Sequence, residues 1–105
     1  MKYIGKNYAD FDSKRKWELF YENMFLVIID NNIKLGLDIN LLGIDATSLK
    51  VKWELGGIIE NEKQYDGIVN IYIKDNFVYA GTYSGFDLKI DYKTGKILEK
   101  VFRKY

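Results

Sequence analysis

Apolar and polar residues alternate with a period of two along most of the chain. Between residues 33 and 41 every odd position is apolar and every even position is polar or glycine. The same alternation recurs at 49–55 and at 86–92, and it is typical of a β-strand with one buried face. Two stretches, 25–29 and 68–73, are more continuously apolar and predict central strands buried on both faces.

The stretches between these predicted strands carry residues that favour tight turns. Asn, Asp and Gly tolerate positive φ or hydrogen-bond their own backbone, and Ser and Thr do so more weakly. The four turn sequences are Asp30-Asn31-Asn32, Asp75-Asn76, Ser84-Gly85 and Thr94-Gly95. Short turns between alternating strands predict an antiparallel meander, in which each strand pairs with the next one along the chain.

The N-terminal region has a mixed pattern, and residues 10–23 fit either a helix or a strand. Asp12 or Ser13 can cap a helix, and apolar residues follow at helical spacing. The segment 17–21 also alternates as a strand does. We expect a short helix or turn near residues 10–16, followed by a strand.

Two parts of the chain resemble each other. Residues 44–55 lie over 90–101 at an offset of 46 positions, and residues 25–31 lie over 70–76 at an offset of 45. A duplicated unit of about 45 residues, made of several short strands, has the repeat length of a β-propeller blade.

The second copy carries the more regular motif. Residues 77–98 run as a strand, a Gly turn, a second strand ending in Asp, and a Thr-Gly-Lys turn. This succession resembles a blade of the quinoprotein-type propellers. The resemblance covers residues 68–104 more fully than 25–55. Leu49 replaces the turn residue Gly95 in the first copy, so we expect that turn to differ.

Two blades cannot close a propeller, which needs roughly four to eight. Stacking the two meanders face to face buries their alternating apolar faces. We therefore predict a single all-β, mainly antiparallel domain over residues 1–105, a compact β-sandwich with repeat-like halves at about 24–58 and 68–104. Lysines within 50–52 and 96–104 suit strands at sheet edges.

The composition excludes several kinds of catalytic and metal-binding site. The 105 residues are 48% hydrophobic, enough for a folded core, and include no cysteine, histidine or proline. Disulfides, thiolate nucleophiles, zinc-thiolate sites and histidine-based triads are therefore excluded. We predict a protein that is not an enzyme, with no catalytic residues, no metal and no cofactor.

The charge balance argues against nucleic-acid and membrane partners. Sixteen basic and fifteen acidic residues give a net charge of +1, so no global field concentrates a polyanion. The longest apolar run, 24–29, is far shorter than the roughly 20 residues that span a bilayer. The first six residues precede no apolar signal core. We expect a cytoplasmic protein with no nucleic-acid or membrane partner.

Tyrosines and carboxylates are the remaining candidates for function. Nine tyrosines are present, and tyrosine is enriched at protein interfaces. Tyr65, Tyr72 and Tyr83 are expected on loops or on polar strand faces. Asp87 and Asp91 share a strand face, as a pair of catalytic carboxylates must share a cleft. We interpret them as solvent-facing residues of an alternating strand.

In size, in its Lys-, Asn- and Ile-rich composition and in its compact β-build, the whole chain is similar to the immunity proteins of bacterial contact-dependent growth inhibition systems. The resemblance is one of overall character. It implies a cytosolic partner, the C-terminal toxin domain of a large exoprotein, which the immunity protein binds and blocks. Toxins of this class are often ribonucleases with basic active sites, so the resemblance implies acidic contacts.

The hypothesis that follows is occlusion of a toxin active site by an acidic surface. Charge complementarity would speed association, and a tyrosine anchor would supply affinity. The predicted partner-binding residues are Glu60, Glu62, Tyr65, Asp66, Tyr83 and Asp87. The alternative is a small-ligand or carbohydrate-binding β-module that uses Trp53 and tyrosines as stacking platforms.

Overall fold

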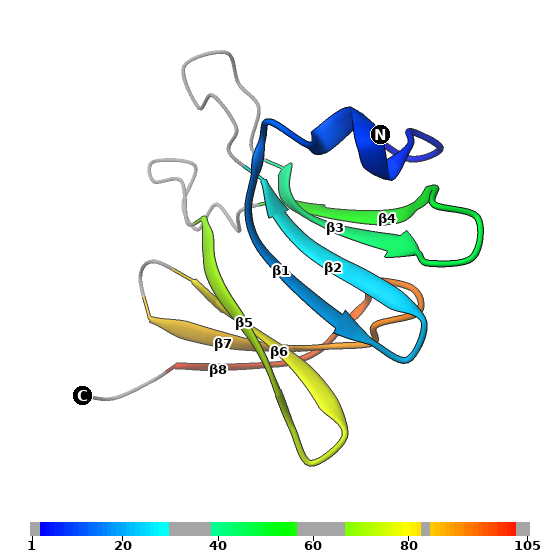
Figure 1. Ribbon diagram of the computed structural model, residues 1–105. Coiled ribbons are helices and arrows are strands. Elements are labelled where there is room, and N and C mark those ends of the chain that lie inside the picture. The colour runs from blue at the N-terminus through cyan, green and yellow to red at the C-terminus, as the bar shows by residue number, and fades with distance from the viewer. Residues whose placement is uncertain (1–2, 30–38, 57–66, 83–84, 103–105) are drawn as a thin grey trace.

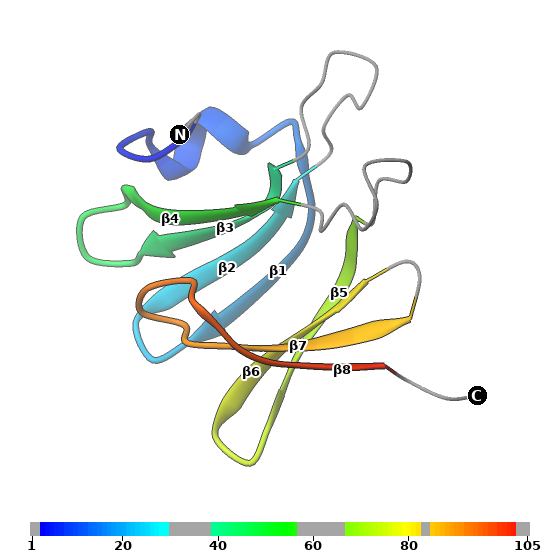
Figure 2. The same ribbon diagram turned by 180° about the vertical axis from the view of Figure 1, so that it is seen from behind.

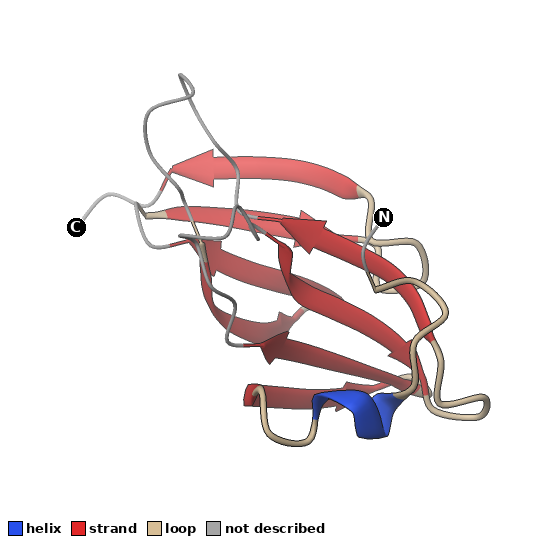
Figure 3. Ribbon diagram, turned by 90° about the horizontal axis from the view of Figure 1, so that it is seen from above, coloured by secondary structure: helices blue, strands red, loops and turns tan. Residues whose placement is uncertain are grey.

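The computed structural model describes residues 3–29, 39–56, 67–82 and 85–102. Nearly all of the regular structure is β-strand (Figure 3). One short 3-10 helix precedes eight strands: η1 Tyr8–Phe11, β1 Arg15–Tyr21, β2 Met24–Ile29, β3 Ile39–Asp45, β4 Val51–Gly56, β5 Ile68–Lys74, β6 Phe77–Thr82, β7 Phe86–Ile90 and β8 Ile97–Phe102. The prediction of an all-β domain is confirmed.

The strands form two antiparallel four-stranded sheets, ordered β1-β2-β3-β4 and β5-β6-β7-β8. In each sheet every strand pairs with its neighbour in sequence, as the short turns predicted. The sheets lie as two layers, the first above the second (Figure 1). From behind, the turn between β7 and β8 reaches up toward the first sheet (Figure 2). The predicted sandwich of two meanders is therefore confirmed.

The two continuously apolar stretches have different places in these sheets. β2 lies inside the first sheet, and Leu26, Val27 and Ile28 on its two faces are all buried, as predicted. The prediction of a central strand at 68–73 is wrong, because β5 is an edge strand. Val69 and Ile73 are 49% and 38% exposed. An apolar run predicts burial, but it does not predict whether a strand pairs with one other strand or with two.

The main core lies between the sheets. Both sheets contribute one face of alternating residues, because the pleat sends every second side chain inward. The buried members are Met24, Leu26, Ile28, Leu41 and Trp53 from the first sheet and Ile68, Ile71, Val78, Ala80, Leu88 and Ile90 from the second. This cluster holds the two sheets together.

The N-terminal segment, residues 3–14, packs on part of the outer face of the first sheet, where Phe20 of β1 remains 57% exposed. Phe11, only 3% exposed, packs on a second cluster formed by that face, with Val27, Leu42 and Val51 among its members. The segment also bonds to β4, since the Gly5 N–H donates to the Val51 carbonyl at 2.9 Å. The molecule is thus layered as N-terminal segment, first sheet and second sheet.

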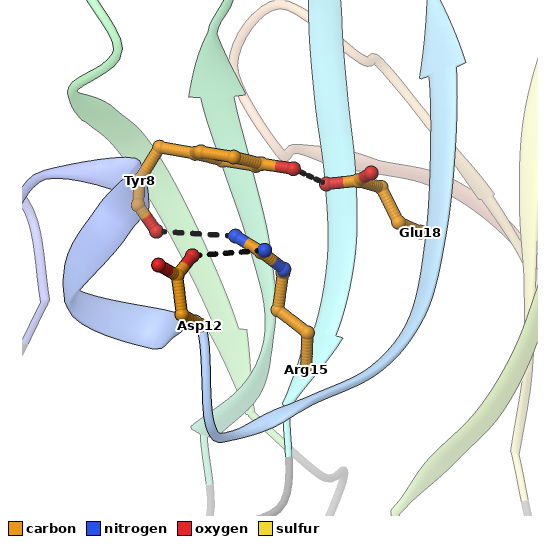
Figure 4. Close-up of polar contacts among 4 residues, drawn as sticks. All are labelled: Tyr8, Asp12, Arg15 and Glu18. Carbon is orange, nitrogen blue, oxygen red and sulfur yellow. Dashed lines mark hydrogen bonds and ion pairs between the residues drawn. The ribbon is translucent and has the colours of Figure 1, made fainter.

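Side-chain contacts fix the N-terminal segment to β1 (Figure 4). The Tyr8 hydroxyl donates to the Glu18 carboxylate, which raises the pKa of Tyr8. The Arg15 guanidinium lies 4.2 Å from the Tyr8 ring centre and pairs with Asp12 at 2.9 Å. The predicted strand is confirmed as β1. The predicted short helix is present as η1, which begins at Tyr8 and so lies slightly earlier than residues 10–16.

The turn of the first repeat does not differ from that of the second. Leu49 has φ +60° and Gly95 has φ +77°. In both turns the N–H of this residue donates to the carbonyl of the aspartate that precedes the turn, Asp45 or Asp91, at 2.7 and 2.8 Å. The expectation of a different turn is therefore wrong, because Leu49 adopts the left-handed conformation that glycine adopts more readily.

No helix in the described part of the chain is long and apolar enough to cross a membrane.

Candidate protein-binding face

The residues predicted to bind a partner fall unevenly in the structure. Asp87 lies in β7 and is half-buried. The other five predicted residues lie outside the described ranges: Glu60, Glu62, Tyr65, Asp66 and Tyr83. The described residues on either side of them show where those parts of the chain join the fold.

A buried amide brings these junctions to one end of the sandwich. Asn40, 6% exposed, donates through Nδ2 to the Ile68 carbonyl at 2.8 Å and accepts from the Ile68 N–H at 3.4 Å. Its neighbour Ile39 pairs with Gly56 at the end of β4. The last residue before the acidic segment 57–66 and the start of β5 after it are thus held close by Asn40.

Asp87 lies at the same end. Ile68 pairs with Thr82, the last residue of β6. The Thr82 hydroxyl accepts from the Phe86 N–H at 3.0 Å, and Asp87 follows directly. We call this end of the sandwich, marked by Asn40, Ile68, Thr82 and Asp87, the Asn40 end. The strand ends that flank the predicted site residues in sequence therefore lie together at the Asn40 end.

Asp87 also belongs to the outer face of the second sheet. Since Ile71, Val78, Ala80, Leu88 and Ile90 point into the core, the alternate positions point away from it. We call these outward positions the open face: Asn70, Tyr72, Lys74, Phe77, Tyr79, Gly81, Asp87, Lys89, Glu99 and Val101. Among the described residues no segment packs over it as residues 3–14 pack over the first sheet.

Two tyrosines stack on the open face where β5 pairs with β6. Tyr72 and Tyr79 are directly opposed on β5 and β6, with ring centres 5.4 Å apart and planes 11° from parallel. Stacked rings on neighbouring strands restrict each other's rotamers, so the pair is a rigid aromatic surface. The expectation that Tyr72 lies on the polar face of a strand is confirmed.

The positive charge on the open face is displaced toward one side. Lys89 pairs with Tyr79 in the strand register, but its ammonium lies 3.8 Å from the ring centre of Phe77. Phe77 and Asp87 lie on opposite sides of Tyr79, because Tyr79 pairs with Lys89 while Gly81 pairs with Asp87. The Lys89 ammonium therefore lies on the Phe77 side of Tyr79.

Trp53 is not a stacking platform, and this part of the carbohydrate hypothesis is wrong. Its ring is 4% exposed, and its indole N–H donates to the Tyr92 carbonyl at 2.7 Å. A Cβ added at Gly95 would lie 2.6 Å from the indole, and one at Gly43 would collide with it. The ring is enclosed between the two sheets because these glycines leave room for it.

An open cleft of about 530 Å³ lies where the turns of both sheets meet, and one of its lining residues, Tyr92, accepts the hydrogen bond from Trp53. We call this end of the sandwich the Trp53 end. Of the lining residues, Asp45 is already held by the Thr47 N–H and the Ser48 hydroxyl, each at 3.1 Å. These bonds lower the pKa of Asp45, the Thr47 bond most. The Asp45 carboxylate therefore accepts hydrogen bonds that stabilise the turn that follows β3.

Several important residues were not predicted from the sequence. Asn40 occupies an even, polar position of the alternating stretch 33–41, and nothing local shows that it is buried. Phe77 and Tyr79 carried a signal, because they alternate with the core residues Val78 and Ala80 and so put aromatic rings on an outward face.

Within the described ranges no three His, Cys, Asp or Glu side chains gather in a way that could hold a metal ion.

The described strands define a two-sheet antiparallel β-sandwich whose first sheet carries the N-terminal segment on its outer face. Comparison with protein families gives a match to a domain of unknown function (DUF7957) over residues 2–102. The chain belongs to that family, whose domain includes the N-terminal segment and all eight strands. No curated protein matches the chain.

Proposed function

We propose that the protein is an immunity protein, which binds a cognate toxin domain in the cytosol and neutralises it by occluding its active site. The observation that carries this proposal is the Asn40 end. There, a buried amide fixes Gly56 and Ile68, on either side of the acidic segment, close to Asp87. Residues far apart in sequence are thus attached to one place on a rigid frame.

The sequence of the attached segment suits a basic partner. Residues 57–66 contain Glu60, Glu62 and Asp66 against the single cation Lys63. A nuclease active site is basic because it binds a polyanion, so an acidic surface can mimic its substrate. Long-range attraction of this kind raises the association rate and sharpens specificity more than it raises affinity.

The affinity would come from aromatic residues that are already ordered. Interfaces are enriched in Tyr and Phe at their centres, where side chains with few rotamers lose little entropy on binding. Tyr72 and Tyr79 stack on each other, and Phe77 is 40% exposed. Strands are also more precise platforms than loops for such contacts.

Charge reversal at the acidic segment tests the proposal. The assay is growth of cells that express the C-terminal toxin domain of the exoprotein encoded directly upstream, with or without this protein. We expect the double variant Glu60→Lys, Glu62→Lys to lose protection and binding. The matched control Glu22→Lys, Asp75→Lys changes the net charge equally, at exposed turn positions outside the Asn40 end and the open face, and should protect fully.

Two results would contradict the proposal. One is a double variant at Glu60 and Glu62 that folds and protects as well as the wild type. The other is a gene neighbourhood that encodes no toxin exoprotein upstream of this protein.

A further inference from the structure

We propose that β8 pairs edge to edge with β8 of a second copy of this chain, so that the second sheets of two molecules join into one antiparallel sheet across a two-fold axis at Lys100. The inference goes beyond the proposed function and does not depend on it, because the occupant of the edge is the protein itself. It rests on the exposure of β8 and on the register that its side chains allow.

The four edge strands differ in what lies beside them. The edge of β4 is bonded to the N-terminal segment, because the Gly5 N–H donates to the Val51 carbonyl and the Val51 N–H donates to the Lys6 carbonyl, each at 2.9 Å. β1 and β5, at the edges of different sheets, approach each other. Among the described strands β8 pairs with β7 alone, and such an edge offers backbone groups to another strand.

β8 carries more exposed large apolar side chains than any other described strand. Leu98, Val101 and Phe102 are 48%, 48% and 59% exposed. All five residues that follow Ile97 in this strand are exposed. Large exposed apolar side chains on a sheet edge favour association with another strand.

Two of these side chains lie on the face of β8 that is turned toward the core. Lys100 pairs with the core residue Leu88, and residues two positions apart in a strand share a face. Leu98 and Phe102 therefore lie on either side of Lys100 on this inner face. The first sheet leaves both of them exposed, so a neighbouring molecule can cover them.

The side chains of β8 select one register for pairing with a second copy. Directly opposed residues of an antiparallel pair point to the same face of the sheet, so a two-fold axis places one residue opposite its own copy. With Lys100 on the axis, Leu98 lies opposite Phe102 of the second copy, and Phe102 lies opposite Leu98. With Glu99 on the axis, two glutamates are opposed and Leu98 meets Lys100, which is unfavourable. Registers centred nearer either end pair only part of β8.

The lysine on the axis does not prevent this pairing. A lysine on an edge strand ordinarily discourages association, but the Lys100 ammonium lies 4.1 Å from the ring centre of Phe86, on β7 of its own sheet. Phe86 packs edge to face on Phe102, with ring centres 5.2 Å apart. The charge is thus directed away from the edge. On the outer face Glu99 lies opposite Val101 of the second copy, so no like charges are directly opposed there.

Single cysteines test the register, because the chain has no cysteine of its own. Directly opposed residues have Cβ atoms about 4.5–5.5 Å apart, close to the spacing that a disulfide needs. Lys100→Cys should therefore form a covalent dimer in a glutathione redox buffer. The matched control Lys74→Cys, at an exposed lysine on β5, should stay monomeric. Equal cross-linking of the two variants, or stronger cross-linking of Glu99→Cys than of Lys100→Cys, would overturn the inference.

The mass of the untagged protein in solution gives the second test. Six-residue edge strands bury a small interface, so the dimer should be weak and depend on concentration. In sedimentation velocity the average mass should rise from that of a monomer toward that of a dimer as the concentration is raised. Phe102→Glu should abolish this rise, because it places a carboxylate opposite Leu98 of the second copy. Phe20→Glu, at a residue 57% exposed on β1, should associate as the wild type does.

The outcomes bear on this inference separately from the proposed function. A wild-type protein that keeps the monomer mass at every concentration overturns the β8 dimer, whether or not it protects cells from the toxin domain. Equal association of Phe102→Glu and Phe20→Glu overturns it as well. If Glu60→Lys, Glu62→Lys protects fully while the wild type dimerises through β8, the proposed function fails and the dimer stands.

Discussion

The two ends of the sandwich are held together by opposite kinds of contact. At the Trp53 end an indole ring is enclosed by two glycines and donates one hydrogen bond across the sheets. At the Asn40 end a single amide makes two backbone hydrogen bonds to Ile68. The Trp53 end joins its strands through short turns, whereas the Asn40 end holds the attachment points of the acidic segment. Apolar packing thus secures the compact end, and a directional polar contact secures the end proposed to bind a partner.

The largest effect is expected from removing the ring at the Trp53 end. Trp53→Ala should lower the free energy of unfolding by about 3–5 kcal/mol, because it leaves a cavity between the sheets and removes a buried hydrogen bond. Urea unfolding followed by circular dichroism measures the loss. Trp17→Ala is the control, since Trp17 is 50% exposed and should cost less than 1 kcal/mol. Equal losses in both variants would mean that Trp53 does not join the sheets.

Removing the amide at the Asn40 end should have a smaller effect on stability and a larger one on binding. Asn40→Ala leaves the Ile68 N–H and carbonyl without this partner in a buried place, which costs about 2–3 kcal/mol. Because Asn40 positions Ile68 beside Gly56, the variant should also bind the toxin domain more weakly than Trp53→Ala does when both are folded. Urea unfolding and calorimetric titration at low temperature give the two values. If Asn40→Ala bound the toxin domain more tightly than Trp53→Ala, Asn40 would have no role in positioning the binding surface.

A modest gain in stability is expected at one turn of the Trp53 end. Leu49→Gly relieves a leucine held at φ +60°. The strain is about 1–2 kcal/mol, and part of the gain is lost to the greater freedom of glycine in the unfolded chain. We expect a net increase of about 0.5–1 kcal/mol in urea unfolding. Gly95→Ala, at the equivalent position, should change stability in the opposite direction because its Cβ meets Trp53 at 2.6 Å.

The smallest effect is the acid dependence of the same turn. The pKa of Asp45 is lowered by hydrogen bonds from Thr47 and Ser48, so its charged form is favoured in the folded state. This contribution is present above the ordinary carboxyl pKa of about 3.9 and is lost as the pH falls through the lowered folded value. Asp45→Asn should therefore cost stability at pH 7 and less at pH 2.5. A cost that does not change between these two pH values would contradict this role.

The sequence predicts the strands well because their chemistry is local. Alternation at 49–55 and 86–92 corresponds to β4 and β7, and the turn at Asp75-Asn76 has positive φ at both residues. The β1–β2 turn was not predicted. Glu22 and Asn23 also have positive φ there, but glutamate gives little signal for that conformation.

The remaining features depend on long-range contacts. Nothing near Ile68 in sequence shows that β5 starts a sheet, and nothing near Asn40 shows that its amide meets a strand 28 residues away. Two parts of the candidate site could be predicted from the sequence: Asp87 and the negative charge of the acidic segment. The open face required knowledge of which outer face residues 3–14 cover, and no periodic pattern carries that information.

The covered face also sets an order of assembly during synthesis. Each sheet is built from neighbouring hairpins, which are local contacts that form quickly. The N-terminal segment is the exception, because its partners are the Leu49 and Val51 carbonyls and the Glu54 carboxylate that accepts from the Tyr3 N–H at 2.8 Å. A nascent chain must therefore wait with Phe11 exposed until β4 has left the ribosome. A chain truncated before β4 would keep β1, β2 and β3 but lose the carbonyls that hold the N-terminal segment, and its exposed apolar surface would make it prone to aggregation.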